Sequence, residues 1–205
     1  MIPAELITTQ QHFRPRIEGA REGEILDATL ALLAEQGYDR LTMDAVAAAA
    51  HASKATLYRR WSTKALLVVD AVARAKDCHR PETPDTGTLR GDLLAMGCGS
   101  GGLTDEAPTA VLAAVLSALH RDHEFADAFQ EHFVAPRRAL SRAVFERAKA
   151  RGEIVGDVDL DLLAGVLPAI ALHQAFVIGR QPTREFIEQV LDQVVIPATQ
   201  VRTCN

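Results

Sequence analysis

Apolar residues recur at spacings of three and four along most of this chain, which is the period of an α-helix. In the segment 24–37, Leu26, Leu30 and Leu33 fall on one stripe, and Gly37 follows at a position suited to ending a helix. Alternating runs of β-branched residues, the pattern of strands, are nearly absent. The pattern therefore predicts an all-α protein.

Three shorter helices are expected next, because a hydroxyl residue that can cap a helix precedes each of them. The caps are Thr42, Ser53 and either Ser62 or Thr63, ahead of helices at about 43–50, 54–61 and 64–76. The segment RPETPDTGT at 80–88 is rich in proline, threonine and glycine, and it predicts a linker at a domain boundary. Beyond the linker, helices are expected at about 89–97, 105–119, 122–150, 158–179 and 183–200.

The most apolar stretch is LLAGVLPAIALHQAFVIG at 162–179. Its uninterrupted apolar part ends at Leu172, because His173 and Gln174 follow, and a membrane span needs about 20 predominantly apolar residues. We therefore expect no membrane span. The helix must instead be covered by its own domain or by a second copy of the chain.

Composition narrows the class of protein. The chain has 205 residues, of which 48% are hydrophobic and 24% charged, as in an ordinary soluble globular protein. Its three cysteines are odd in number and form no C-x-x-C pair, which argues against a disulfide framework and a thiolate zinc site. The first residues show no signal-peptide pattern, so a cytoplasmic location is expected.

Positive charge is concentrated in one short segment of an acidic chain. The formal net charge is −5, yet residues 51–64 hold four cations and no acid; removing these four from 22 leaves 18 basic against 27 acidic residues. The same segment contains the only tryptophan and one of two tyrosines. An acidic body with one basic tip predicts a local partner of negative charge.

Residues 42–61 fit a helix-turn-helix, with a turn at 51–53 between two short helices. In the second helix Leu57 and Trp61 lie one turn apart, so this stripe can pack inward. We expect no nearby acid to pair with the cations of residues 51–64. The opposite arc carries Lys54, Ala55, Tyr58 and Arg59, with Thr56 at its edge.

Each outward side chain has chemistry suited to DNA. Lys54 and Ala55 occupy the first turn, which meets base edges, and Arg59 can contact a base or a phosphate. Thr56 and Tyr58 offer hydroxyls to phosphate. Two further residues begin helices and can clamp the backbone in the same way, namely Thr42 and Lys64.

The segment LTMDAVAAAAHASKATLYRRWSTKALL, preceded by AEQGYDR, resembles the DNA-binding signature of the tetracycline-repressor (TetR) family. The resemblance covers about residues 20–70. It implies about nine helices, in which an N-terminal three-helix head binds DNA and a C-terminal helical domain regulates and dimerises. The family's DNA contacts fall here on Thr42, Lys54, Ala55, Thr56, Tyr58, Arg59 and Lys64, with Arg60 between the buried stripe and the outward arc.

The resemblance also predicts a domain plan and a partner. Residues 1–15 would form an arm without fixed structure, 16–64 the helix-turn-helix domain, and 65–205 the ligand-binding and dimerisation domain. A homodimer through the helices at about 160–179 and 183–200 would place two heads on a near-palindromic operator. The facing row of the last helix would be Phe186, Val190, Val194 and Pro197, or else Ile187, Leu191 and Val194.

Members of this family are typically released from DNA by a small molecule, so a pocket is expected within about 89–178. We expect an apolar or weakly polar effector, and the protein is predicted to be a repressor. The residues that we expect to line the pocket are Leu116, Phe125, Phe129, Phe133 and Phe176. The alternative is an all-helical small-molecule carrier or enzyme without a DNA role.

Two motifs and one missing motif bear on other functions. Residues 97–102 match G-x-G-x-x-G, but that fingerprint requires a preceding β-strand, and the sequence before it is helix-like. His120, His123 and His132 share a helical stretch without further ligands, so no metal is expected. No G-x-S-x-G elbow is present. We therefore predict no catalytic residue and no cofactor.

Overall fold

The computed structural model describes residues 20–76, 83–99, 102–104, 109–155 and 158–200. Every regular element in these ranges is helical, which confirms the predicted all-α class. The predicted arm at 1–15 lies outside the described residues, as do 80–82 of the predicted linker and 105–108 at the start of the helix expected at 105–119.

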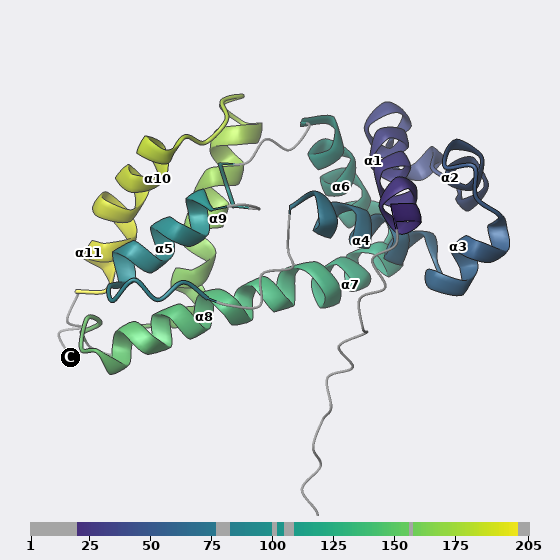
Figure 1. The fold of residues 1–205 in the computed structure, drawn as a ribbon. Helices are drawn as coiled ribbons and strands as arrows, with labels where there is room; N and C mark the ends of the chain where they lie inside the picture. The colour runs from purple at the N-terminus through teal and green to yellow at the C-terminus, as the bar shows by residue number, and fades with distance from the viewer. Residues whose placement is uncertain (1–19, 77–82, 100–101, 105–108, 156–157, 201–205) are drawn as a thin grey trace, which may run out of the picture.

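The described residues form nine continuous helical stretches, the number that the family resemblance implies (Figure 1). Two of these stretches contain a short π-helical turn. The longest runs through α7, η1 and α8, and the last through α10, η2 and α11. The bounds are α1 Ala20–Arg40, α2 Met43–Ala49, α3 Lys54–Arg60, α4 Lys64–Ala75, α5 Leu89–Cys98, α6 Thr109–Arg121, α7 His123–Phe129, η1 Gln130–Val134, α8 Ala135–Ala150, α9 Leu160–Phe176, α10 Arg184–Val190, η2 Leu191–Val195 and α11 Ile196–Ala198.

The predicted caps are in place at the starts of the short helices. The hydroxyl of Thr42 accepts from the Ala45 amide at 3.1 Å, and Ser53 accepts from Thr56 at the same distance. Of the two candidates for the next helix it is Thr63 that caps α4. Gly37 has φ 77° and ψ 172°, so its φ is positive as expected of a glycine but its ψ is extended, and the chain kinks there before helical residues continue to Arg40.

Two hydrophobic cores hold the helices together. The first joins α1–α4 to buried residues of α6 and α7, including Val115 and Phe125. The second joins α5, α8, α9, α10 and η2 around Phe145, Leu167 and Leu191. The continuous helix α7–η1–α8 crosses from one core to the other and runs below the other helices in the view of Figure 1. The head and the C-terminal half are therefore linked by one long helix as well as by the chain after α4.

The structure decides between the two facing rows expected for the last helix. Ile187 and Leu191 are fully buried in the second core, so they cannot face a second subunit. Val194 and Pro197 are exposed, whereas Val190 is buried, so only part of the other row is accessible. The row that contains Ile187 is wrong because these side chains pack on α5 and α9 of the same chain.

A membrane role finds no support in the helices. Within the described ranges, none of them combines the length and the apolar character that a transmembrane helix requires.

Candidate nucleic-acid interface and ligand cavity

The α2–turn–α3 unit has the predicted geometry of a helix-turn-helix. His51 begins the turn with φ 50°, and the amide of Ala52 donates to the Ala47 carbonyl at 2.8 Å. From α1, the guanidinium of Arg21 donates to the His51 carbonyl. These bonds fix α3 relative to the rest of the head.

One face of α3 is anchored as predicted. Leu57 is fully buried and Trp61 is 2% exposed. The indole N–H of Trp61 donates to the Asp70 carboxylate at 2.8 Å, so the one polar atom of this large side chain is satisfied inside the core. The opposite face must therefore point away from the protein.

The outward face carries the side chains that the sequence placed there. Tyr58 is 52% exposed, which is unusual for an aromatic ring, and Lys54, Ala55 and Arg59 are exposed as well. Thr56 is half-buried, and its hydroxyl shares a hydrogen bond with the Ser53 hydroxyl at 2.8 Å. The predicted orientation of α3 is confirmed, while the contacts of these residues with DNA stay a prediction.

The expectation that no acid pairs with the cations of this segment is wrong. Lys54 lies 2.6 Å from the Asp44 carboxylate of α2, and Arg60 lies 3.0 Å from Glu22 of α1. The hydrogen bond that Lys54 donates to the Asp44 carboxylate raises the pKa of Lys54 above its usual value. Both partners of the Lys54–Asp44 pair are more than half exposed, so this pair is solvated and easily exchanged for another anion.

Lys64 is held more tightly than expected. Its ammonium donates to the Tyr38 carbonyl at 3.0 Å and lies 4.0 Å from the centroid of the Tyr38 ring. The side chain is half-buried between α4 and the end of α1. Thr42 is exposed at the start of α2, where its hydroxyl already caps the helix. Lys64 therefore combines a structural contact with a position near the DNA-facing edge.

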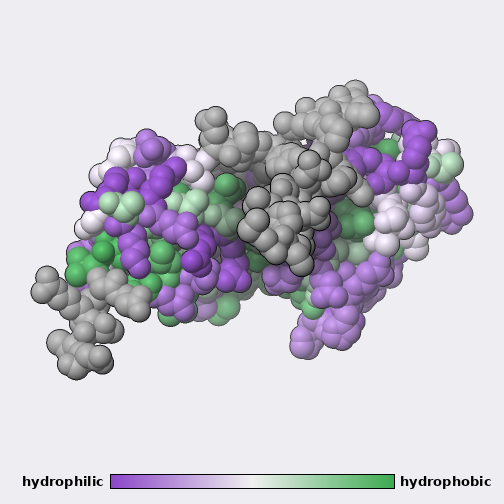
Figure 2. Space-filling view, turned by 90° about the horizontal axis from the view of Figure 1, so that it is seen from below, coloured by the Kyte–Doolittle hydropathy of each residue, from purple (hydrophilic) through white to green (hydrophobic). Residues whose placement is uncertain are grey.

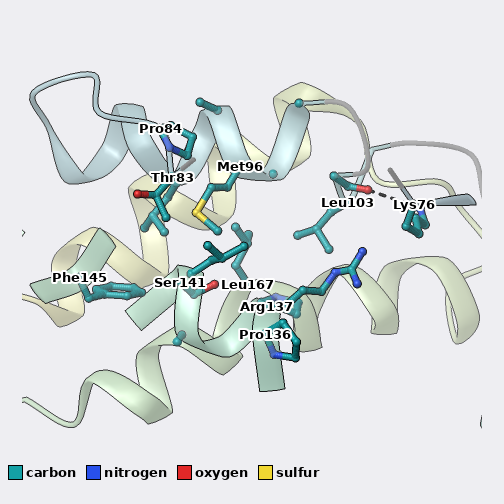
Figure 3. Close-up of a pocket in the computed structure, with 18 of the residues that line it drawn as sticks. Lys76, Thr83, Pro84, Met96, Leu103, Pro136, Arg137, Ser141, Phe145 and Leu167 are labelled. Atoms are coloured by element: carbon teal, nitrogen blue, oxygen red, sulfur yellow. Dashed lines mark hydrogen bonds between the residues drawn. The ribbon is translucent and has the colours of Figure 1, made fainter. Parts of the chain in front are cut away.

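A cavity of about 270 Å³ lies in the C-terminal half, near its junction with the head (Figure 3). Residues from α5, η1, α8, α9 and η2 line it, together with Lys76, Gly99 and the segments 83–84 and 102–103. Most of the lining is apolar, with Phe145 and Leu167 among its larger side chains. The exceptions include the side chains of Lys76, His132 and Arg137.

Only one residue predicted for the pocket lines this cavity, and it is Phe133. Phe125 and Phe129 are buried in the first core, because their stretch of the long helix packs on the head. Leu116 is 41% exposed on α6, and Phe176 lies at the end of α9 without lining the cavity. For four of the five residues the prediction is therefore not supported, since helical spacing alone does not tell which core a face joins.

Four aromatic rings form a continuous array from the end of α1 to the cavity. Tyr38 and Phe125 have ring centroids 4.5 Å apart, Phe125 and Phe129 5.8 Å, and Phe129 and Phe133 4.5 Å. The last pair is stacked. Burial raises the pKa of the Tyr38 hydroxyl, and the nearby Asp122 adds to the rise.

Each end of the array carries a cation. At the head, the ammonium of Lys64 lies over the Tyr38 ring. At the cavity, the guanidinium carbon of Arg137 lies 3.7 Å from the centroid of Phe133. The contacts thus run without a break from a cavity residue to a residue of the predicted DNA surface.

The two motifs that argued for other functions have ordinary places in the fold. Gly97, Gly99 and Gly102 line the cavity, so this segment borders it; residues 100 and 101 lie outside the described part. The helix α5 precedes the segment, which is not the strand that a dinucleotide fingerprint requires. In the described ranges no three metal-ligating side chains come together.

The sequence did contain a signal for the cavity that was not recognised. Phe133, Arg137, Leu140 and Ser141 recur at spacings of three and four along the long helix, and all four line the cavity. The partners from α5 and α9, such as Met96 and Leu163, could not have been assigned, because no local pattern relates three separate helices.

Known proteins share both halves of this architecture. Residues 25–71 match a family model described as "Bacterial regulatory proteins, tetR family", and residues 83–194 match "Tetracyclin repressor-like, C-terminal domain".

Two relatives align along most of the chain. This chain is 41% identical over 182 residues to the uncharacterized HTH-type transcriptional regulator Rv1556 of Mycobacterium tuberculosis (strain ATCC 25618 / H37Rv), with 87% of each chain covered. It is 36% identical over 179 residues to the DNA-binding transcriptional repressor TetR of Mycobacteroides abscessus, with 86% of this chain and 92% of the relative covered. Among solved structures, Salmonella enterica GusR shares the fold with a TM-score of 0.69 at 21% identity, covering 88% of this chain and 96% of that chain.

The helix-turn-helix with its outward basic face, joined to a helical domain that holds a cavity, defines a DNA-binding transcriptional regulator rather than an enzyme. With family models matching most of its length, the chain belongs to the TetR family.

Proposed function

We propose that this regulator is a homodimeric repressor that binds a near-palindromic operator and is released from it by a small molecule. The observation that carries the proposal is the division of α3 between a buried face, anchored by Leu57 and Trp61, and an exposed face. An exposed tyrosine surrounded by cations has no role in the core of the head. It suits the groove and backbone of DNA.

The DNA contacts divide by position on the helix. Lys54 and Ala55, in the first turn of α3, face base edges, so they set operator preference. Thr56, Tyr58 and Arg59 reach phosphates, and Arg59 can also donate to a base. Thr42 and Lys64 bind the backbone on either side of α3 at the starts of α2 and α4.

The name of the relative in Mycobacteroides abscessus supports repression rather than activation. A protein that acts on bacterial DNA works in the cytoplasm, which is the location we propose.

The dimer interface is proposed to lie on α9 and on the last helix. Leu162 is 67% exposed and Leu172 41% exposed on α9, and Val177 and Ile178 just beyond it are more than half exposed. Val194 of η2 adds to this set. In Figure 2 apolar surface is spread over the half of the molecule that holds α8–α11, whereas the half with α2 and α3 is mostly hydrophilic. Pairing these helices with those of a second copy would form a four-helix bundle and cover the apolar side chains.

Release would start at the cavity. The long helix α7–η1–α8 carries cavity residues at one end and residues of the head core at the other. A ligand that shifts this helix also moves the array from Phe133 to Tyr38, on which Lys64 lies. Such a ligand must bind more tightly to the conformation that does not fit DNA, because equal affinity for both conformations shifts nothing.

Fluorescence anisotropy with labelled DNA from upstream of the gene tests the proposal. We expect specific binding in the nanomolar range that weakens steeply between about 50 and 200 mM salt, because bound phosphates release counterions. A scrambled sequence of the same length serves as the control. Equal, weak binding to both DNAs would contradict the proposal and favour the helical carrier.

A further inference from the structure

We propose that Tyr38 is a positioning residue for DNA binding: it holds the ammonium of Lys64 in place for a phosphate and joins this contact to the start of the long helix. The inference rests on the proposed function in taking Lys64 as a contact to the DNA backbone. It adds a buried residue of α1, which does not itself touch DNA, to the groups that determine operator affinity.

The first support is that one residue contacts the ammonium of Lys64 in two ways. The ammonium donates to the main-chain carbonyl of Tyr38 at 3.0 Å, and it lies 4.0 Å from the centroid of the Tyr38 ring. Tyr38 is itself only 4% exposed, so it is a fixed support. A lysine has a long, flexible side chain, and freezing it on binding costs entropy. Because Lys64 is held beforehand, it loses less conformational freedom when it binds a phosphate.

The second support is that these contacts leave Lys64 suited to a phosphate. An ammonium has three N–H donors, of which the Tyr38 carbonyl takes one. Lys64 is half-buried rather than enclosed, and it is the first residue of α4. Side chains of a helix tilt toward its N-terminus, so the ammonium and the positive end of the α4 dipole attract the same anion.

The third support is the way in which Tyr38 is placed. Gly37 kinks α1 with φ 77° and ψ 172°, and Tyr38 follows directly after this kink. The Tyr38 carbonyl accepts from the Leu41 amide at 3.2 Å as well as from Lys64. A main-chain group at the end of α1 therefore determines where a side chain of α4 is held.

Tyr38 also joins this contact to the start of the long helix. Its ring lies on that of Phe125 in α7, with the centroids 4.5 Å apart. Asp122 caps α7 by accepting from the Phe125 amide at 2.9 Å. Burial raises the pKa of the Tyr38 hydroxyl, and the charge of Asp122 and a hydrogen bond to it raise this pKa further. A shift of α7 thus displaces Tyr38 and, with it, the place where Lys64 is held.

A double-mutant cycle tests the inference, with operator affinity of the full-length protein measured by anisotropy. Lys64→Met removes the charge, so it should weaken binding and lower the slope of log affinity against log salt by about one for each head. Tyr38→Leu keeps this charge but removes the ring, so it should weaken binding by about five- to tenfold with the salt slope of the wild type. In the Lys64→Met background, Tyr38→Leu should have no further effect.

Tyr38→Phe and Leu33→Ala are the matched controls. Tyr38→Phe keeps the ring and the carbonyl, so it should bind operator as tightly as the wild type. Leu33 is fully buried on α1, and its side chain takes no part in the contacts of Lys64. Any effect of Leu33→Ala on affinity should be the same in the wild-type and Lys64→Met backgrounds, because a loss of packing alone does not depend on Lys64.

A second measurement uses the wild type and decides the inference if Tyr38→Leu does not fold. Carbon-13 relaxation of labelled lysines should give the Lys64 side chain a higher order parameter than that of Lys149, which is exposed on α8. Lys64→Arg identifies the signal of Lys64.

Three outcomes would overturn the inference: operator affinity that Tyr38→Leu leaves unchanged or raises, equal effects of Tyr38→Leu in both backgrounds, or a Lys64 side chain as mobile as that of Lys149. These outcomes differ from a failure of the proposed function. Specific operator binding that depends on Lys64 but not on Tyr38 would contradict the inference and support the proposed function. Equal binding of operator and scrambled DNA would contradict the proposed function, while the order parameter of Lys64 would still show whether Tyr38 holds it.

Discussion

The ammonium of Lys54 and the carboxylate of Asp44 lie 2.6 Å apart, on the two helices of the helix-turn-helix. Asp44 thus places a negative charge beside the first turn of α3, where DNA is proposed to bind. Replacing it by asparagine removes both the competitor for Lys54 and a charge that repels phosphate.

We therefore expect Asp44→Asn to increase affinity for operator and unrelated DNA alike, by several-fold at low salt, because the removed repulsion is electrostatic. Anisotropy titrations measure both affinities. Asp39→Asn is the control with the same change of charge, since Asp39 pairs with Arg121 of α6. Equal effects of the two substitutions would show that only net charge matters.

Tyr58→Ala is expected to weaken binding to all DNA sequences by about tenfold, because the side chain is proposed to contact the backbone and not a base. Tyr58→Phe should recover part of the loss if the ring packs against the sugar–phosphate chain. Stability should hardly change, since the side chain is 52% exposed. Unchanged affinity of Tyr58→Ala would show that the face of α3 assigned to DNA is wrong.

Leu162→Asp is expected to dissociate the dimer, because it introduces a charge into a proposed subunit interface. Sedimentation velocity at micromolar concentrations should then show monomers, and operator affinity should fall because two heads no longer bind together. Leu116→Asp is the control, an exposed leucine on α6 outside this interface. A dimer that persists in Leu162→Asp would place the interface elsewhere.

Asp92 of α5 ties the end of the predicted linker to the second core. The carboxylate is fully buried, and it accepts hydrogen bonds from the Thr86 amide at 2.6 Å and from Arg151 at 3.3 Å. Burial by itself raises the pKa of Asp92, but the hydrogen bonds that Thr86 and Arg151 donate to the carboxylate outweigh this effect. The pKa of Asp92 therefore lies below its ordinary value of 3.8.

Because the folded state lowers this pKa, the charge of Asp92 stabilises the protein above pH 3.8 and stops doing so as pH falls through the folded value. Asp92→Ala should reduce the free energy of unfolding by about 1–3 kcal/mol near pH 7, since it leaves the Thr86 amide and Arg151 without their acceptor. Urea denaturation measures the loss. Asp192→Ala, which breaks the exposed pair with Arg90, should change little.

Much of the head was predictable because its determinants are local. The hydroxyls of Thr42, Ser53 and Thr63 bond to amides three residues away, and Gly37 takes a conformation that few other residues tolerate. The buried and exposed faces of α3 follow from helical spacing alone. These features depend only on residues within one or two helical turns, so the sequence by itself specifies them.

The failed predictions concern residues that are distant in the chain. Asp44 meets Lys54, and Glu22 meets Arg60, only because α1, α2 and α3 are packed together. Likewise the periodicity of the long helix is the same at Phe125 as at Phe133, although one residue joins the core of the head and the other lines the cavity.

By itself, then, the sequence determined the helices, their caps and the outward face of α3, because spacing and capping act within single helices. The tertiary structure alone decided which acids neutralise the basic segment, which face of the last helix stays exposed, and where the cavity with Arg137 lies. Each of these depends on helices that meet in space after folding, and such contacts between separate elements leave no periodic trace in the chain.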